Sequence, residues 1–593
     1  MRTTVTRAAA VVIAGVLLTA CGDRSGKGAD SDGAVGTTGR SGASLAAVFE
    51  GDAPAFVGRD AEGTRLWKLT RQFYQKRGDA PAWIEDRKPR PQMDELLRVL
   101  QAADREGLDP ALYNVPTLAA RREEAGRGFL SMKGFSEDEA GRLDVWLTYL
   151  YLRYASDLTN GIADLSHADP AWKLRDKPTN PAPLLEDALA NNHVAKSLED
   201  LTPRHPQYTG LRDTLAKYRE IAQHGGWSPL PADLKLKPGQ SHAAVPALAK
   251  RLAVTADYSG TVNEQDTAYG PELQEAVKRF QRRHGLEPDG AVGRAVIAQM
   301  NVPVETRIKQ IALNLERWRW LPRDLGERHI LVNVPEYRLE VWDGAQVPLS
   351  MRVVVGKKDT PTPIFADDMT YVVFSPYWNV PADIVKNETV PSALRDSAFL
   401  ERTNMEVLDK SGKPVEASAI DMDQIEQYRF RQRPGSSNSL GLVKFMFPNS
   451  FNVYLHDTPA DSLFARATRS FSHGCVRVEQ PEKLAEYVLG DQSEWTPQRI
   501  AEAMQAGTER TVKLSRPLPV YLGYWTARVS ADGLLQLRDD LYGIDARQMT
   551  LLTRVVDKLK TRAAEAATAF GTAAQSSRAD GRNPPASTAS HPH

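Results

Sequence analysis

Two short segments of the chain contain residues whose types can carry out covalent catalysis. One is Ser472-His473-Gly474-Cys475, and the other contains a second histidine, His456. A thiolate is a nucleophile, and a nearby imidazole generates it by accepting the thiol proton. One cysteine with two histidines in reach therefore predicts covalent catalysis. The alternative is a small buried apolar side chain, which the glycine before Cys475 and the polar residues around it disfavour.

A metal site at the same residues is disfavoured by the number of ligands. His456, His473 and Cys475 are all zinc ligand types. Structural zinc takes four ligands, often in paired short spacings, and no further cysteine or close histidine pair is available here. The sequence therefore predicts neither a metal nor another cofactor.

The other cysteine, Cys21, ends an amino-terminal segment with the layout of a secretory signal. Two arginines precede an apolar stretch, and small residues stand before Cys21. The ending Leu18-Thr19-Ala20-Cys21 resembles a bacterial lipoprotein box, in which the cysteine is lipidated and becomes the mature amino terminus. The alternative is an ordinary signal peptide with a chance cysteine. We expect residues 1–21 to be a lipoprotein signal peptide with a lipid on Cys21.

Lipidation of Cys21 would explain why Cys475 has no disulfide partner in an oxidising compartment. It would also tether the protein to a membrane. Gly22 follows the cysteine, and under the sorting rule of such lipoproteins this favours the outer membrane. The sequence therefore predicts a periplasmic, membrane-anchored protein of a Gram-negative bacterium.

The overall composition does not indicate a particular class of binding partner. The chain of 593 residues has 75 basic and 75 acidic residues, so its formal net charge is zero. No overall field favours nucleic acid, and we expect no nucleic-acid partner. Residues 22–45 are rich in Gly, Ser and Asp and are expected to form a flexible tether. The end of the chain, 546–593, is expected to be helical and then, from about Gln575, disordered.

Helical patterns dominate residues 46–238, which we expect to form a helical scaffold domain. Apolar residues recur at three- and four-residue spacing in Met93 to Glu106 and in Arg142 to Leu158. Breaks rich in Pro and Gly separate such segments. The segment contains no cluster of catalytic residue types, so its expected role is to support or position the rest of the chain.

A small module is expected at residues 239–303. Pro271 to His284 has apolar residues on one face, a proline at its start and Gly285 after its end, which predicts an amphipathic helix. The string VKRFQRRHGLEPDGAVG resembles the small three-helix peptidoglycan-binding domain. The motif positions are Phe280, Gln281, His284, Gly285, Leu286, Asp289, Gly290, Val292 and Gly293. The alternative is a helical hairpin that binds nothing, because function depends on sites more than on fold.

Strand patterns surround the two reactive segments, within a predicted unit at 304–545. Runs rich in Val, Leu and aromatic residues begin at His329, and Asp343-Gly344 indicates a hairpin. Two short helices are expected to begin at Pro481 and Pro497, the second capped by Thr496. This pattern is typical of a mostly β unit.

The motifs around His456 and Cys475 resemble those of a known family. His456, then fifteen residues at 457–471, then Ser472-His473-Gly474-Cys475-Val476-Arg477 is similar to the signature of YkuD-type L,D-transpeptidases. Further support comes from Thr360-Pro361-Thr362-Pro363, from Trp378-Asn379-Val380-Pro381 and from NSLGLVKFMFPN. The resemblance is to the large periplasmic subgroup. It implies a multidomain α+β protein with a helical scaffold domain, a three-helix peptidoglycan-binding-like domain and a mostly β catalytic domain with a cap inserted at about 383–440.

The resemblance also implies roles for the site residues. Cys475 is the nucleophile and His456 the base that generates the thiolate, while His473 orients the site or contacts substrate. The side chain of Asp457 is expected to point away on the strand, leaving its backbone carbonyl to hold the His456 ring. Backbone N–H groups around His473, Gly474 and Cys475, in the turn that begins at Ser472, are expected to stabilise the oxyanion.

Substrate contacts are predicted for Arg477, Trp378 and Asn379. Arg477 can bind a substrate carboxylate bidentately, or it forms a structural ion pair near the site. The family cleaves a tetrapeptide stem between diaminopimelate and D-Ala and passes the acyl group to another diaminopimelate, which makes a 3-3 cross-link. The cap is expected to close over the stem and exclude water from the thioester.

Several activities fit the same residues. If water replaces the acceptor amine, the enzyme is an L,D-carboxypeptidase. If a lysine of a small lipoprotein accepts the acyl group, the enzyme anchors protein to the wall. A catalytically silent wall-binding lipoprotein is a further alternative, and the family further implies acylation of Cys475 by carbapenem-type inhibitors.

Overall fold

The computed structural model describes residues 45–127, 134–169, 172–174, 179–416 and 419–579. It contains a helical amino-terminal region, a small helical module and a large mixed sheet, so the predicted multidomain α+β class is confirmed. The predicted signal peptide and nearly all of the predicted tether lie outside the described residues. Within these residues, no helix combines the length and the apolar character needed to cross a membrane.

The amino-terminal region is a bundle arranged around one long helix, α5. Nearly every residue of α5 is buried, and the Ser136 hydroxyl caps its start by accepting the N–H of Glu139 at 3.2 Å. Its apolar side chains form one core with those of the surrounding helices. The helices are α2 (Ala61–Lys76), α3 (Pro91–Gln101), α4 (Val115–Arg127), α5 (Glu137–Asn160), α6 (Ala182–Ala190) and α7 (Val194–Glu199), with a small hairpin of β1 (Ile84–Glu85) and β2 (Lys88–Pro89).

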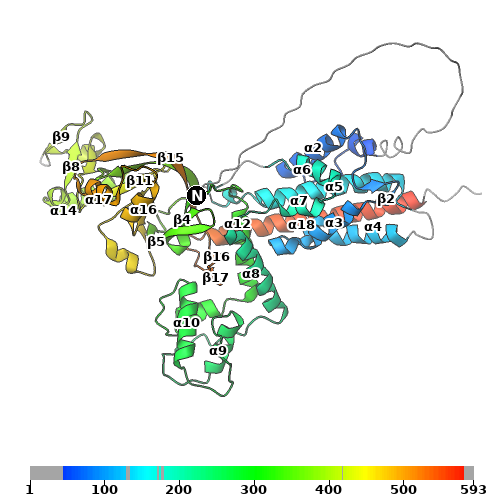
Figure 1. Cartoon of the computed structure of the whole chain (residues 1–593), viewed down its shortest axis with the longest axis horizontal. Helices are drawn as coiled ribbons and strands as arrows, with labels where there is room; N and C mark the ends of the chain where they lie inside the picture. The colour runs from blue at the N-terminus through cyan, green and yellow to red at the C-terminus, as the bar shows by residue number, and fades with distance from the viewer. Residues whose placement is uncertain (1–44, 128–133, 170–171, 175–178, 417–418, 580–593) are drawn as a thin grey trace, which may run out of the picture.

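The last helix of the chain, α18 (Ile544–Ala579), returns to this bundle. Figure 1 shows it in red among the blue and cyan helices. Phe570 and Ala566 belong to the bundle core, and the Phe570 ring lies 5.1 Å from that of Trp146. The expectation of disorder from about Gln575 is therefore wrong as far as Ala579, because the helix continues to that residue; residues 580–593 lie outside the described residues.

The helix α8 (Pro206–Gln223) joins the bundle to the sheet region. The sequence assigned it to the scaffold domain, yet its apolar side chains pack against α12 (Val304–Trp318) in the core of the sheet region. The buried carboxylate of Glu316 in α12 also accepts the N–H of Ile162 at 2.6 Å. The bundle and the sheet region are therefore connected by packing and by a buried polar contact.

The small module contains α9 (Val245–Val254), α10 (Pro271–Arg283) and α11 (Arg294–Met300), as the sequence predicted. Leu248, Phe280 and Ile297 meet in a core of their own. The motif residue Gln281 donates from Nε2 to Asp289 at 2.7 Å, which holds the turn after α10. Buried Arg283 pairs with Asp257. The motif positions thus stabilise the fold of the module.

The sheet has nine strands in the order β13-β5-β14-β12-β11-β6-β15-β3-β4. The long strand β5 pairs with β4 through its first half and with β14 through its second half, so the strand order closes on itself. The bounds are β3 (Arg328–Asn333), β4 (Arg338–Asp343), β5 (Gln346–Gly356), β6 (Phe365–Phe374), β11 (Val443–Met446), β12 (Leu455–His456), β13 (Ser470–Ser472), β14 (Val476–Val478) and β15 (Arg510–Gly523).

Shorter elements complete this region. The helices α16 (Pro481–Val488) and α17 (Pro497–Gln505) begin at the predicted prolines, and the Thr496 hydroxyl caps α17. A hairpin of β16 (Ala527–Val529) and β17 (Leu535–Leu537) follows β15 and contacts the small module. Arg538 donates to the carbonyl of Arg283 at 2.9 Å. The hairpin therefore connects the small module to the sheet.

The predicted cap is a separate layer with its own core. Its sheet has the order β7-β10-β8-β9, and Val385, Val407 and Phe430 are buried within it. The bounds are β7 (Trp378–Asn379), α13 (Ala382–Ile384), a π-helical turn (Val385–Thr389), α14 (Val390–Arg395), α15 (Phe399–Arg402), β8 (Met405–Leu408), β9 (Pro414–Val415) and β10 (Arg429–Gln432).

Candidate active site

The register of three neighbouring strands brings the reactive residues together. Lys444 in β11 lies opposite His456 in β12, and His456 lies opposite Arg477 in β14. Side chains two residues apart on a strand share a face. Tyr454 and Cys475 stand two residues before His456 and Arg477, and the N–H of Val476 extends the pairing by donating to the Tyr454 carbonyl at 3.2 Å. The predicted nucleophile and base therefore lie on one face of the sheet.

His456 is placed to act as a proton acceptor. Its Nδ1 lies 2.6 Å from the carbonyl oxygen of Asp457; a nitrogen this close to a carbonyl carries the proton, so Nε2 is left as the acceptor. Burial, first, and then the positive charges of Arg477 and Lys444 lower the pKa of His456 to about 3, against the opposing effect of the Asp457 carbonyl. The imidazole is therefore neutral at pH 7 and can take a proton.

Asp457 supports the site through its backbone, as the sequence analysis expected. Its carboxylate accepts the N–H groups of Leu442 at 2.8 Å and Thr458 at 2.7 Å. Gly441 has a φ of +62°, and a Cβ there would lie 2.3 Å from the Asp457 carboxyl carbon. The carboxylate is thus used to hold the 441–442 turn, and the carbonyl to orient His456.

Cys475 is a free cysteine and is partly exposed. The thiol donates weakly to the carbonyl of Asn452, with 3.8 Å between the two atoms. Burial raises the pKa of the Cys475 thiol above its ordinary value, while hydrogen bonds from Tyr454 and the charge of Arg477 lower it. The thiol is therefore protonated at neutral pH and needs a base to become a nucleophile.

The turn before Cys475 is closed by Ser472. The Ser472 hydroxyl donates to the Cys475 carbonyl at 2.5 Å and accepts the N–H of Gly474 at 3.2 Å. Gly474 has a φ of +117°, which favours glycine. One of the three N–H groups expected to stabilise the oxyanion is therefore engaged by Ser472. Within the described part of the chain, the N–H groups of His473 and Cys475 have no hydrogen-bond partner.

Two threonines hold this turn from the neighbouring loop. Thr360 donates its hydroxyl to the Ser472 carbonyl at 3.1 Å, and Thr362 donates to the Gly474 carbonyl at 2.8 Å. Thr362 also accepts the N–H of Gly356 at 2.9 Å. Tyr542, at the start of the carboxy-terminal segment, donates to the Gly356 carbonyl at 2.7 Å. The Thr-Pro-Thr motif thus positions the nucleophile turn, Ser472 to Cys475, which contains the predicted nucleophile.

His473 points to the cap. Its Nε2 lies 2.6 Å from the Glu388 carboxylate in the π-helical turn Val385–Thr389. Both side chains keep part of their surface exposed, with 33% for His473 and 53% for Glu388. Because its Nε2 is engaged by the cap, His473 is less suited than His456 to serve as the base. The role of His473 in catalysis stays a prediction.

Arg477 forms no ion pair with any residue that the structure describes. Its Nε is buried without a hydrogen-bond partner, which is costly unless a ligand or water completes it. The alternative was a structural ion pair, but no carboxylate in the described part of the chain pairs with Arg477. An unpaired guanidinium beside Cys475 and His456 is suited to bind an anion.

Trp378 and Asn379 lie in the cap sheet, where they pair with Gln432 and Arg431. Trp378 packs on the cap core and Asn379 is exposed. Neither residue makes a hydrogen bond or a ring contact with Cys475 or His456 among the described residues. Their substrate contacts stay a prediction.

Tyr454 and Lys444 are site residues that the sequence analysis did not select. Tyr454 hydrogen-bonds to the Cys475 sulfur, and Lys444 contributes positive charge next to His456. The two-residue alternation of Tyr454-Leu455-His456 was a signal for the first. Lys444 had no such signal, because only the pairing of β11 with β12 brings it to His456.

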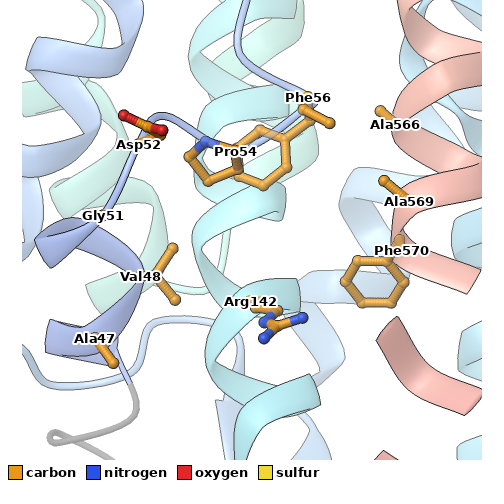
Figure 2. Close-up of a pocket in the computed structure, with 11 residues that line it drawn as sticks. Ala47, Val48, Gly51, Asp52, Pro54, Phe56, Arg142, Ala566, Ala569 and Phe570 are labelled. Atoms are coloured by element: carbon orange, nitrogen blue, oxygen red, sulfur yellow. The ribbon is translucent and has the colours of Figure 1, made fainter. Parts of the chain in front are cut away.

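Among the residues with described positions, no group of three or more His, Cys, Asp or Glu side chains could hold a metal ion. An apolar cavity of about 300 Å³ lies in the bundle, where residues 47–56 approach α5 and α18. Figure 2 shows Phe56, Arg142 and Phe570 around it. None of its lining residues belongs to the catalytic sheet.

Three parts of the chain match known families. Residues 327–513 match the YkuD family, described as an L,D-transpeptidase catalytic domain. Residues 241–300 match a family described as "Putative peptidoglycan binding domain", and residues 68–215 match a scaffold domain. These three matches account for the sheet region, the small module and most of the bundle.

One curated relative matches less than half of this chain. A curated protein of Haemophilus influenzae, described as "Putative L,D-transpeptidase", is 35% identical over 251 residues. The match covers 42% of this chain and 50% of the relative, so the chain spans about half the length of the relative that it matches.

Solved structures of the same class are less similar. An L,D-transpeptidase from Mycobacterium smegmatis is 14% identical, covering 33% of this chain and 58% of that chain with a TM-score of 0.16. One from Xylanimonas cellulosilytica is 16% identical, covering 50% and 99% with a TM-score of 0.16.

Proposed function

We propose that this protein, whose residues 327–513 form an L,D-transpeptidase catalytic domain of the YkuD family, makes 3-3 cross-links in peptidoglycan through a thioester on Cys475. The observation that carries the proposal is the shared sheet face of Cys475 and His456, with Nδ1 of His456 held by the Asp457 carbonyl. A thiol and a neutral imidazole with a free Nε2 are the groups that acyl transfer requires.

The first half of the reaction forms the acyl-enzyme. Nε2 of His456 accepts the Cys475 proton as the sulfur attacks the carbonyl carbon between diaminopimelate and D-Ala of a tetrapeptide stem. The N–H groups of His473 and Cys475 stabilise the oxyanion that forms. When it collapses, the C–N bond breaks, His456 returns its proton to the departing amine of D-Ala, and the acyl group remains on Cys475 as a thioester.

The second half transfers the acyl group. The side-chain amine of a second diaminopimelate attacks the thioester carbon and loses a proton to His456. The C–S bond breaks, and the Cys475 sulfur takes the proton back. The product contains a new amide between two diaminopimelate residues, and the enzyme is restored.

The charges around the site support a substrate with free carboxylates. Arg477 and Lys444 lie on either side of His456 across the sheet. The unpartnered Nε of Arg477 offers a donor to a carboxylate, and the terminal D-Ala of the tetrapeptide stem carries one next to the cleaved bond. The same two cations lower the pKa of His456, so they keep the base neutral as well.

The cap supports transfer to an amine over transfer to water. It contacts the nucleophile turn through Glu388 and His473. A layer that covers the thioester would keep water away while the acceptor binds. Opening the cap would then increase hydrolysis to tripeptide.

The proposal includes a periplasmic location, with the protein held to the outer membrane by a lipid on Cys21. Its support is the resemblance of Leu18-Thr19-Ala20-Cys21 to a lipoprotein box. Labelling with a radioactive fatty acid tests this part, because Cys21→Ala should lose the label and release the protein from the membrane fraction.

The reaction is tested by incubating the purified protein with disaccharide tetrapeptide and identifying the products by mass spectrometry. We expect a dimer with a 3-3 link from the native chain and unchanged substrate with Cys475→Ala. If tripeptide is the only product, the enzyme is an L,D-carboxypeptidase and not a transpeptidase. If the native chain leaves the substrate unchanged, the proposal that this protein is an enzyme is refuted. A carbapenem should add its mass to Cys475, because a thiolate opens the strained β-lactam amide.

A further inference from the structure

A second cleft lies on the sheet region, apart from the proposed active site. It has a volume of about 690 Å³ and is formed by the end of α10, the strands β4 and β5, and the segment 465–469. Cys475, His456 and Arg477 do not line it. Its volume is in the range of sites that hold small ligands or short peptides.

Arginine is the most frequent residue in the lining of the cleft. Six arginines and three carboxylates form its walls. Three of the arginines are neutralised by carboxylates, in the pairs Arg338–Glu340, Arg352–Glu479 and Arg538–Glu336. The other three, Arg282, Arg466 and Arg469, have no ion-pair partner within the described part of the chain. The lining carboxylates Glu287 and Asp539 form no ion pair with any of these six arginines. Positive charge therefore exceeds negative charge in the cleft.

The unpaired arginines come from different parts of the molecule and are held at one place. Arg282 lies in the last turn of α10 of the small module, and Gly285, just after the helix, packs so closely that a Cβ there would lie 3.0 Å from Arg538. Arg469 donates to the carbonyl of Tyr337 at 3.2 Å and to that of Val353 at 3.3 Å. The cleft is therefore built between two domains that hydrogen bonds connect.

Tyr337 provides an independent sign of a binding site in this cleft. Its φ is +56°, which is rare for a bulky side chain. Residues held in such conformations occur preferentially where a ligand binds. The Tyr337 ring lies 5.2 Å from the guanidinium of Arg469, so an aromatic face and unpaired cations line the same wall.

We propose that this cleft binds the carboxylates of a peptidoglycan stem other than the one being cleaved, which gives the enzyme a second hold on the wall polymer. The inference rests on the proposed function. Stem peptides carry several free carboxylates, and arginine binds a carboxylate through two parallel hydrogen bonds. The segment 465–469 leads directly into β13 and the nucleophile turn, so a stem in the cleft would lie against the chain that positions Cys475.

Charge reversal of Arg282 and Arg466 tests the cleft. Both side chains are exposed and donate no hydrogen bond among the described residues, so Arg282→Glu with Arg466→Glu should leave the fold intact. The matched control is Arg554→Glu with Lys558→Glu, which makes the same change of net charge on an exposed face of α18. All binding measurements use the full chain with Cys475→Ala, because this change prevents turnover.

Binding to intact sacculi is measured by co-sedimentation at low and high salt. We expect the cleft variant to bind about tenfold more weakly than the parent at low salt, because two charge-assisted contacts are lost. The control should bind within about twofold of the parent. The difference between cleft variant and parent should shrink at high salt. Equal binding by parent and cleft variant at low salt would overturn the proposal.

Sacculi treated with an amidase, which removes the stems and leaves bare glycan, identify the ligand. Binding of the parent should fall to the level of the cleft variant, and undiminished binding would overturn the assignment to stem carboxylates. With Cys475 present, the cleft variant should process soluble disaccharide tetrapeptide within about twofold of the native rate. If the native chain has no activity on this substrate, the proposed function is refuted. The binding of the Cys475→Ala chain to sacculi tests stem binding in the cleft separately.

Discussion

Replacing Tyr454 by phenylalanine removes one hydroxyl beside the nucleophile and keeps the ring. The hydroxyl hydrogen-bonds to the Cys475 sulfur and lowers the pKa of that thiol. A hydrogen bond to a charged group is worth about 1.5–3 kcal/mol. Since about 1.4 kcal/mol corresponds to a tenfold change in rate, acylation of Tyr454→Phe should be about 10- to 150-fold slower.

The same loss should appear in the titration of the thiol. Without the donor, the thiolate is less stable, so the apparent pKa of Cys475 should rise. The assay is the rate of alkylation of Cys475 by iodoacetamide as a function of pH, because this reagent reacts with the thiolate and needs no substrate site.

The control for this experiment is Tyr371→Phe, which removes a hydroxyl from β6, a strand of the same sheet that β11 separates from β12. That hydroxyl makes no hydrogen bond with any residue that the structure describes, and we expect the native profile. If Tyr454→Phe also shows the native pH profile and acylation rate, the hydroxyl does not stabilise the thiolate. The role assigned to Tyr454 in lowering the pKa of Cys475 is then wrong.

Three other changes probe the cap, the nucleophile turn and the base. Glu388→Gln removes the charge that faces His473 across 2.6 Å and should raise the ratio of tripeptide to cross-linked dimer, while Glu401→Gln, in the same cap, should leave it unchanged. Thr362→Val removes hydrogen bonds to two buried backbone groups and should cost about 1–3 kcal/mol of unfolding free energy and slow turnover; Thr362→Ser should restore most of both, and a fully active valine variant would contradict its positioning role. Because burial lowers the pKa of His456 to about 3, the base stays neutral as pH falls, so kcat/KM should show no protonation of a histidine between about pH 5 and 7; an acid limb centred near pH 6.5 would refute that assignment.

The reactive groups could be selected from the sequence because their chemistry is local. Cys475 and His456 were identified by residue type and by the spacing between their motifs, and the Asp457 carbonyl was expected beside the base because it belongs to the next residue. Helix starts at Pro271, Pro481 and Pro497 were predicted for the same reason: proline and capping residues act within one turn.

Contacts between distant segments could not be predicted in this way. Lys444 reaches His456 only through the pairing of β11 with β12, and Glu388 reaches His473 only because the cap folds over the turn. The start of the segment 546–593 was expected to be helical, but its packing was not predicted, and α18 places Phe570 against Trp146 in the bundle. Each of these contacts depends on partners far away in the chain.

The sequence alone determined which residues are candidates for the reaction and which elements carry them, since residue type, spacing and local backbone preference are properties of short segments. Only the tertiary structure decided the electrostatics of the site, because burial and the charges of Arg477 and Lys444 set the pKa of His456. It also decided that Arg282, Arg466 and Arg469 line one cleft. Such properties arise from strand register and domain packing, in which residues hundreds of positions apart become neighbours.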